Sequence, residues 1–154
     1  MDKERVGEAH PAFVLIIGQL APDELLVLRQ LDVESPRAYF RLSEASPALT
    51  LVETRARLVA SPLGEASAEG LLRAAVRPEE LAQPMLFLTF FGHLQSLGLT
   101  EYTNVPAGER YDRSFLGVEH HFIRLTDFGR LFLSACVSRA GAELPSAVFR
   151  GVAN

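Results

Sequence analysis

The sequence predicts a mostly helical α+β protein, with a winged-helix-like C-terminal half packed against helices from the N-terminal half. Two long apolar segments carry this prediction, Pro84–Leu99 and His121–Cys136. The first has the pattern of a helix that stops at Gly98 and leads into a short strand over 99–103. The second reads as a strand ending at Leu125, followed by a new helix. Helix, strand, loop, strand and helix is the order found in the C-terminal part of a winged helix.

Length and composition favour one soluble domain. The chain has 154 residues, of which 48% are hydrophobic and 22% charged, which is typical of a globular protein with a substantial core. We expect a single domain over 10–145, with the winged-helix-like part at about 78–140. A flexible lead-in over 1–9 and a loose tail over 146–154 flank it.

The charge balance argues against a strongly nucleic-acid-binding protein. The net charge is −4, the excess of acids lies within residues 1–80, and neither half is basic. Phosphate neutralisation by basic residues supplies most nucleic-acid affinity, so this balance weakens that interpretation.

Cysteine content and hydropathy indicate a cytoplasmic protein. Cys136 is the only cysteine, which excludes an intramolecular disulfide and fits a reducing compartment. The segment Leu81–Leu99 carries no charged residue, but proline and polar residues interrupt it. We therefore expect a buried helix rather than a membrane span, and no membrane partner. The first eight residues are charged and lack the apolar core of a signal peptide.

The N-terminal half begins with two apolar segments. Ala12–Ile17 follows a proline and fits either a short helix buried on most sides or a strand. Pro22 presets the first turn of a second helix, where Asp23 and Glu24 favour the positive end of the helix dipole. This helix is expected to end near Leu31.

The middle of the chain has a less regular pattern. Residues 47–60 fit helical spacing somewhat better than alternation, a helix is expected over 67–76, and Pro78–Glu80 reads as the start of the next. No helix or strand is predicted over residues 37–46. They contribute three expected core residues, namely Tyr39, Phe40 and Leu42.

A helix over about 82–97 is apolar on nearly every side, so it must be buried in its own chain or against a partner. This pattern favours a homodimer or another protein partner. After the loop over 104–117 and the second strand, Thr126 is a good N-cap and Asp127 favours the first turn. That last helix has its core stripe at Phe128, Leu131, Phe132 and Ala135, and is expected to close before Pro145.

Four segments resemble the Abi-alpha family, a group of bacterial and phage-associated proteins. They occur in the order His10–Phe13, Gln19–Glu24, Leu94–Leu99 and Leu125–Cys136. One departure is Ala21, where the family has a serine that would cap the following helix. The resemblance implies a link to abortive infection, a form of phage defence. It implies no catalytic residues that could be carried over to this chain.

No pattern of reactive side chains predicts an enzyme. His120 and His121 are adjacent on a strand and point to opposite faces, so one should lie in the core, the other should contact solvent, and the two cannot readily bind one ion. Cys136 lies near a core stripe and should act as a small hydrophobic residue. The acid pairs Asp23–Glu24 and Glu79–Glu80 both stand at expected helix starts, where the dipole explains them. We expect no catalytic residue, no metal and no cofactor.

Two functions remain as hypotheses. The first is a non-catalytic protein-interaction module that self-associates and acts in phage defence. The alternative is a winged-helix DNA-binding regulator. In that case the contacts would come from the 82–97 helix and from the wing, and its apolar helix and the wing acids Glu109 and Asp112 count against it. The candidate residues for DNA contact are Thr89, His93, Gln95, Arg110, Arg113 and Arg124.

Overall fold

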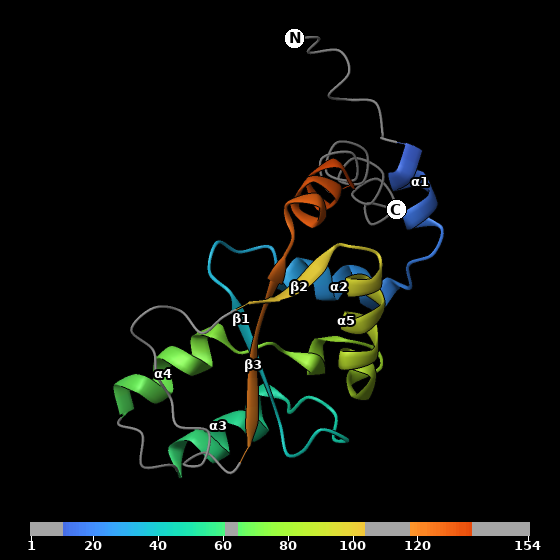
Figure 1. Ribbon diagram of the computed structural model, residues 1–154. Helices are drawn as coiled ribbons and strands as arrows, with labels where there is room; N and C mark the ends of the chain where they lie inside the picture. The colour runs from blue at the N-terminus through green and yellow to red at the C-terminus, as the bar shows by residue number, and fades with distance from the viewer. Residues whose placement is uncertain (1–10, 61–64, 104–117, 137–154) are drawn as a thin grey trace, which may run out of the picture.

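A three-stranded antiparallel sheet joins the two halves of the chain. The computed structural model describes residues 11–60, 65–103 and 118–136. Its strands are β1 (Arg37–Arg41), β2 (Thr100–Thr103) and β3 (Glu119–Leu125), in the order β1-β3-β2 (Figure 1). The central strand β3 therefore pairs with a strand from each half, with Tyr39 opposite His121 and Tyr102 opposite Ile123. The prediction of a mostly helical α+β fold is confirmed.

Strand β1 is the element that sequence reasoning missed. Its three central residues, Ala38, Tyr39 and Phe40, are all buried, because helices cover both faces of the sheet. A short strand buried on both faces shows no alternation of polar and apolar residues. Leu42 was predicted to lie in the core, and this is wrong: it follows the end of the strand and is exposed.

The first two helices are α1 (Pro11–Ile17) and α2 (Pro22–Gln30). Of the two alternatives for the first segment, the helix is right, but its burial on most sides is wrong, because only Phe13 and Ile16 are buried. The second helix begins where Pro22 predicts. Since Ala21 has no side-chain oxygen, the Glu24 carboxylate provides the local contact instead, accepting from the Ala21 backbone N–H at 2.8 Å.

Two further helices, α3 (Leu51–Val59) and α4 (Glu65–Ala74), confirm the helical interpretation of the middle segment. The start of α3 is a reciprocal capping box. Thr50 Oγ1 accepts from the Glu53 N–H, and the Glu53 carboxylate accepts from the Thr50 N–H, each at 3.2 Å.

The expected helix over 82–97 is shorter than predicted. Two 3₁₀ turns, η2 (Pro78–Glu80) and η3 (Pro84–Leu86), precede α5 (Phe87–Ser96). The backbone N–H groups of Ala82 and Gln83 donate to the Asp23 carboxylate, both at 2.9 Å. The approach to the helix is therefore fixed by a contact with α2.

Helix α5 ends as the sequence predicts. Gly98 has φ +77°, the Leu99 N–H donates to Leu94 O at 3.0 Å, and the Gly98 N–H donates to Gln95 O at 3.0 Å. This is a Schellman motif, which requires the left-handed conformation that glycine adopts without strain.

The last helix of the described residues, over 127–136, begins at the predicted cap, but its predicted core stripe is wrong at Leu131, which is 62% exposed. Thr126 Oγ1 accepts from the Gly129 N–H at 2.9 Å, and the Thr126 N–H donates to Leu99 O at 3.0 Å. Close packing explains the glycine at position 129. A Cβ at that position would lie 2.0 Å from Leu99 O, so only glycine lets this helix approach the start of β2 so closely.

Two helical layers enclose the sheet (Figure 1). Helices α2, α5 and 127–136 cover one face and form a core with Tyr39, Ile123 and Leu125. Helices α3 and α4 cover the other face, where a second core includes Phe40 and Phe122. Four expectations lie outside the described residues: the lead-in over 1–9, the loop over 104–117, the close of the last helix before Pro145 and the tail over 146–154.

No single helix among the described residues is both long and apolar enough to cross a bilayer. The pair α1 and α2 reaches that length and composition together, but the two helices are bent by 116° to each other.

Candidate functional site

The two adjacent histidines of β3 face opposite layers, as predicted. His120 is buried beside the rings of Phe40 and Phe122, each with a centroid 6.0 Å away. His121 lies on the other face, partly exposed, with the rings of Tyr39 and Tyr102 at 5.1 and 5.8 Å. One ion cannot bridge this pair. Among the described residues no group of three or more potential ligand side chains is arranged to hold a metal.

His121 belongs to a polar and aromatic cluster at one end of the sheet, which we call the tyrosine cluster: Tyr39, Arg41, Tyr102, Glu119 and His121. The Tyr39 and Tyr102 hydroxyls lie 3.0 Å apart. Arg41 Nε donates to Glu119 Oε2 at 2.9 Å, and its guanidinium carbon lies 5.9 Å from the centre of the Tyr39 ring. The polar groups of the tyrosine cluster therefore mostly contact one another.

The electrostatics of the tyrosine cluster do not activate a nucleophile. Burial raises the pKa of the Tyr39 hydroxyl, and the hydrogen bond to Tyr102 raises it further. His121 Nε2 is 3.8 Å from Glu119 Oε2, which is longer than a hydrogen bond. Tyr102 and Glu119 are the most exposed members of this cluster, and the Tyr102 side chain can contact a partner.

The residues predicted for DNA contact are not brought together into one reading surface. Thr89 and Gln95 are exposed on α5, but they are six residues apart and so roughly 120° apart around the helix. His93 Nδ1 lies 2.5 Å from Glu24 Oε1, and Arg124 Nε donates to Glu101 Oε1 at 2.7 Å. The two wing arginines, Arg110 and Arg113, lie outside the described residues.

The acid pairs have tertiary roles that the helix dipole does not explain, so that part of the sequence interpretation was incomplete. Asp23 and Glu24 are both buried, Glu24 to 3% exposure. The Asp23 carboxylate holds the backbone of residues 82 and 83, and Glu24 holds His93 and the Ala21 N–H. Asp23 thus connects α2 to the segment that leads into α5, and Glu24 connects α2 to α5 itself. Nothing in the local sequence indicates the contacts with residues 82, 83 and 93, because these are 59 to 69 residues away.

The second acid pair also reaches distant residues. The Glu79 carboxylate accepts from the Leu51 N–H at 3.1 and 3.3 Å, which satisfies a free donor at the start of α3. Glu80 Oε1 pairs with Arg77 Nη1, and Glu80 Oε2 accepts from Gln30 Nε2, both at 3.4 Å.

Cys136 is half-buried against the larger core. Burial raises the pKa of its thiol, which disfavours the thiolate that a nucleophile needs. Its surroundings agree with the role of a small hydrophobic residue.

A group of three exposed apolar side chains lies on α1. Val14, Leu15 and Ile17 are 59%, 70% and 52% exposed, and we call these three side chains the α1 outer face. The helix is anchored by Phe13, whose ring lies 5.5 Å from that of Phe128 and 5.4 Å from that of Phe132. The chain has no charged residue from Pro11 through Pro22. The α1 outer face is therefore apolar and uncharged.

The fold defines a small, mostly helical α+β protein. The sequence model of the abortive infection alpha family matches residues 1–136, most of the chain, and the chain belongs to this family. No curated protein and no solved structure matches it.

The segments that carry the family resemblance correspond to structural joints. Leu94–Leu99 forms the Schellman end of α5, and Leu125–Cys136 contains the Thr126 cap and the Gly129 approach to β2. In this chain both segments hold the ends of helices in place.

Proposed function

We propose that this chain is a non-catalytic protein-interaction module that acts in abortive infection in the cytoplasm and associates with its own copy. The α1 outer face is the observation that carries the proposal. Three large apolar side chains are exposed together on one seven-residue helix. Side chains of this kind gain free energy when a partner covers them.

The absence of charge on α1 supports a second copy as the partner. A twofold symmetric interface brings the same surface against itself, so a charged residue near the symmetry axis meets its own like charge. The chain as a whole carries a net charge of −4, yet residues 11–22 carry none. This part of the surface can meet its copy without that repulsion.

Analytical ultracentrifugation over a range of micromolar concentrations tests the proposal. We expect the full chain to shift from monomer to dimer, and Val14→Ser with Leu15→Ser to remain monomeric. The matched control is Val52→Ser on α3, which removes an equally exposed apolar side chain and should still dimerise. A wild-type monomer at every concentration, or loss of the dimer in the control, would contradict the proposal.

A winged-helix-like unit used as a scaffold is the finer architecture that we propose for residues 78–140. It is supported by the succession α5, β2, β3 and helix 127–136, with β2 and β3 antiparallel. The same succession is the observation that favours the alternative function, a DNA-binding regulator. Against DNA contact, His93 and Arg124 already have acidic partners.

Fluorescence anisotropy with labelled DNA separates the two functions. A regulator requires binding that survives physiological salt and falls when Arg110→Ala is combined with Arg113→Ala. The interaction module predicts no binding that resists competitor DNA. Sequence-specific binding of the wild type would favour the regulator.

A further inference from the structure

Three arginines line a hollow between α2, β1 and η2. The hollow has a volume of about 360 Å³, and we call it the arginine hollow. Glu80 is the one acid among the residues that line it, so its lining is net positive in a chain that is net negative overall. Its lining residues are Leu26, Arg29, Gln30, Arg37, Ala75, Arg77 and Glu80.

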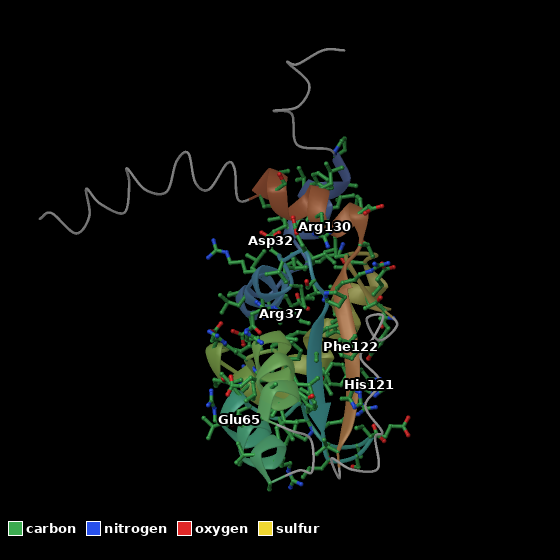
Figure 2. The ribbon with its side chains drawn as sticks, turned by 90° about the vertical axis from the view of Figure 1, so that its left-hand side faces the viewer. Asp32, Arg37, Glu65, His121, Phe122 and Arg130 are labelled. Atoms are coloured by element: carbon green, nitrogen blue, oxygen red, sulfur yellow. The ribbon has the colours of Figure 1, made fainter. Side chains whose placement is uncertain are left out.

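Arg37 is the fixed element of this hollow. Its Nε donates to Gln30 O at 3.1 Å, and its Nη1 donates to Arg73 O at 2.7 Å. Both carbonyls lie in the last turns of helices, α2 and α4, where a cation is favourable. Figure 2 places Arg37 between these two helices. These contacts explain why β1 begins with an arginine. They do not explain the two other arginines that line the hollow, Arg29 and Arg77.

Arg77 is held beside Arg37 by its own main chain. Its N–H donates to Gln30 Oε1, and its carbonyl accepts from Gln30 Nε2, both at 2.8 Å. The Arg77 side chain makes a longer contact, 3.4 Å, with Glu80. The backbone at Arg77 is therefore fixed, while its guanidinium makes one weak contact, with the half-exposed Glu80 side chain.

The positive charges in the hollow repel one another. Burial lowers the pKa of the Arg37 guanidinium, and the charge of Arg77 lowers it further, while Glu80 acts in the opposite direction. A bound anion would offset this repulsion. Arginine's planar fork of N–H donors matches the oxygens of a phosphate group better than it matches a monatomic anion.

A larger hollow adjoins the first and shares Arg37. It has a volume of about 680 Å³, and its lining combines Val33, Pro36 and Ala74 with the charged Glu34 and Arg73. Small-molecule sites are mostly apolar with a few convergent polar groups, and they occupy roughly 300–1,000 Å³. The second hollow has the size and lining to accept the organic part of a molecule whose charged group lies at Arg37.

We propose that the arginine hollow binds the phosphate group of a small organic phosphate. Arg29, Arg37 and Arg77 hold the phosphate oxygens, and the adjoining hollow holds the organic part. This site goes beyond the proposed interaction function, because it lies on α2, β1 and η2 rather than on α1.

Isothermal titration calorimetry on the full chain in chloride buffer tests the site, with inorganic phosphate, adenosine 5′-monophosphate and adenosine as probes. We expect the monophosphate to bind more tightly than inorganic phosphate, and adenosine to show no heat of binding. Combining Arg29→Gln with Arg77→Gln should weaken monophosphate binding by at least about tenfold, because each charge-assisted hydrogen bond contributes strongly.

Two further variants sharpen this test. Glu80→Gln removes the acid that lines the hollow and should tighten phosphate binding, whereas Arg55→Gln, on the exposed side of α3, should leave binding unchanged. Circular dichroism checks that each variant is folded. Arg37 itself is left intact because its carbonyl contacts hold two helices.

Three outcomes would overturn the proposal. They are equal binding by the double variant and the wild type, equal binding of adenosine and its monophosphate, and binding of single-stranded DNA in the absence of any binding of phosphate or the monophosphate.

Discussion

Helices α1 and α5 both carry several large apolar side chains, yet the fold uses them in opposite ways. Helix α5 buries Phe87, Phe91 and Leu94 between α2 and the sheet. Helix α1 buries Phe13 and Ile16 and leaves the rest of its apolar surface exposed. The comparison teaches that apolar side chains on a helix need to be covered, but their pattern does not say whether the same chain or a partner covers them. For α5 the same chain covers them, and for α1 we propose that a second copy does.

The largest expected effect tests the burial of α5. Phe91→Ala removes a ring that is 1% exposed and should lower the free energy of unfolding by about 3–5 kcal/mol, through lost burial and a residual cavity. Urea denaturation followed by circular dichroism measures it. Met85→Ala, which truncates an exposed side chain just before α5, is the control and should change stability little. Similar losses in both variants would mean that α5 is not part of the core.

A second variant tests the support beneath α1. Gly129→Ala places a methyl group against Leu99 O and should destabilise the protein by about 1–3 kcal/mol, because the 127–136 helix must move away from β2. The matched control is Gly92→Ala within α5, where nothing lies near the added Cβ. That change should stabilise the helix by about 0.5–1 kcal/mol. Thermal unfolding of the two variants should therefore shift in opposite directions, and a neutral Gly129→Ala would contradict the described approach.

The third prediction concerns pH and the sheet face beneath α5. The folded state raises the pKa of Tyr39 above its ordinary 10.0, so it holds this proton more tightly than the unfolded chain. The associated stability is complete below about pH 10 and is lost as the pH rises further. Tyr39→Phe should cost about 0.5–1.5 kcal/mol at neutral pH and should reduce the alkaline loss.

Urea denaturation at neutral pH and above pH 10 measures this change. Tyr102→Phe is the control, since it removes the same hydrogen bond and leaves Tyr39 buried. It should keep most of the alkaline loss, and an identical pH profile for the two variants would assign the loss to another group.

The smallest expected effect on stability is on α1. Leu15→Ala should change the free energy of unfolding by no more than about 0.5 kcal/mol, because the side chain is 70% exposed. Chemical denaturation at low protein concentration measures it. A loss comparable to that of Phe91→Ala would show that Leu15 is buried within the monomer, and the contrast between the two helices would disappear.

The parts of the fold that the sequence predicts are those governed by neighbouring residues. Gly98, Thr126 and Pro22 mark helix ends through local backbone geometry, and all three do so in the structure. Strand β1 was missed because burial on both faces removes its alternation. The start of α5 was misplaced because a separate 3₁₀ turn, η3, precedes the helix, and Asp23, far away in sequence, holds the backbone of Ala82 and Gln83 before that turn.

The candidate sites were harder to predict for the same reason. Arg29, Arg37 and Arg77 have no common spacing in the sequence, and they meet only when β1 is placed between α2 and α4. His93 was assigned to a DNA surface from its position on a helix, whereas a buried acid on another helix determines its contact. Sequence patterns describe one element at a time, and these groups depend on several.

The strand order has a consequence for how the protein is made. Strand β3 lies between β1 and β2 but is synthesised after both, and its Glu119 pairs with Arg41 across 78 residues. A nascent chain must therefore leave the ribosome with two edge strands that lack their shared neighbour, and nonlocal pairing of this kind is slow. Any truncated product that ends before residue 119 loses the pairing of the whole sheet.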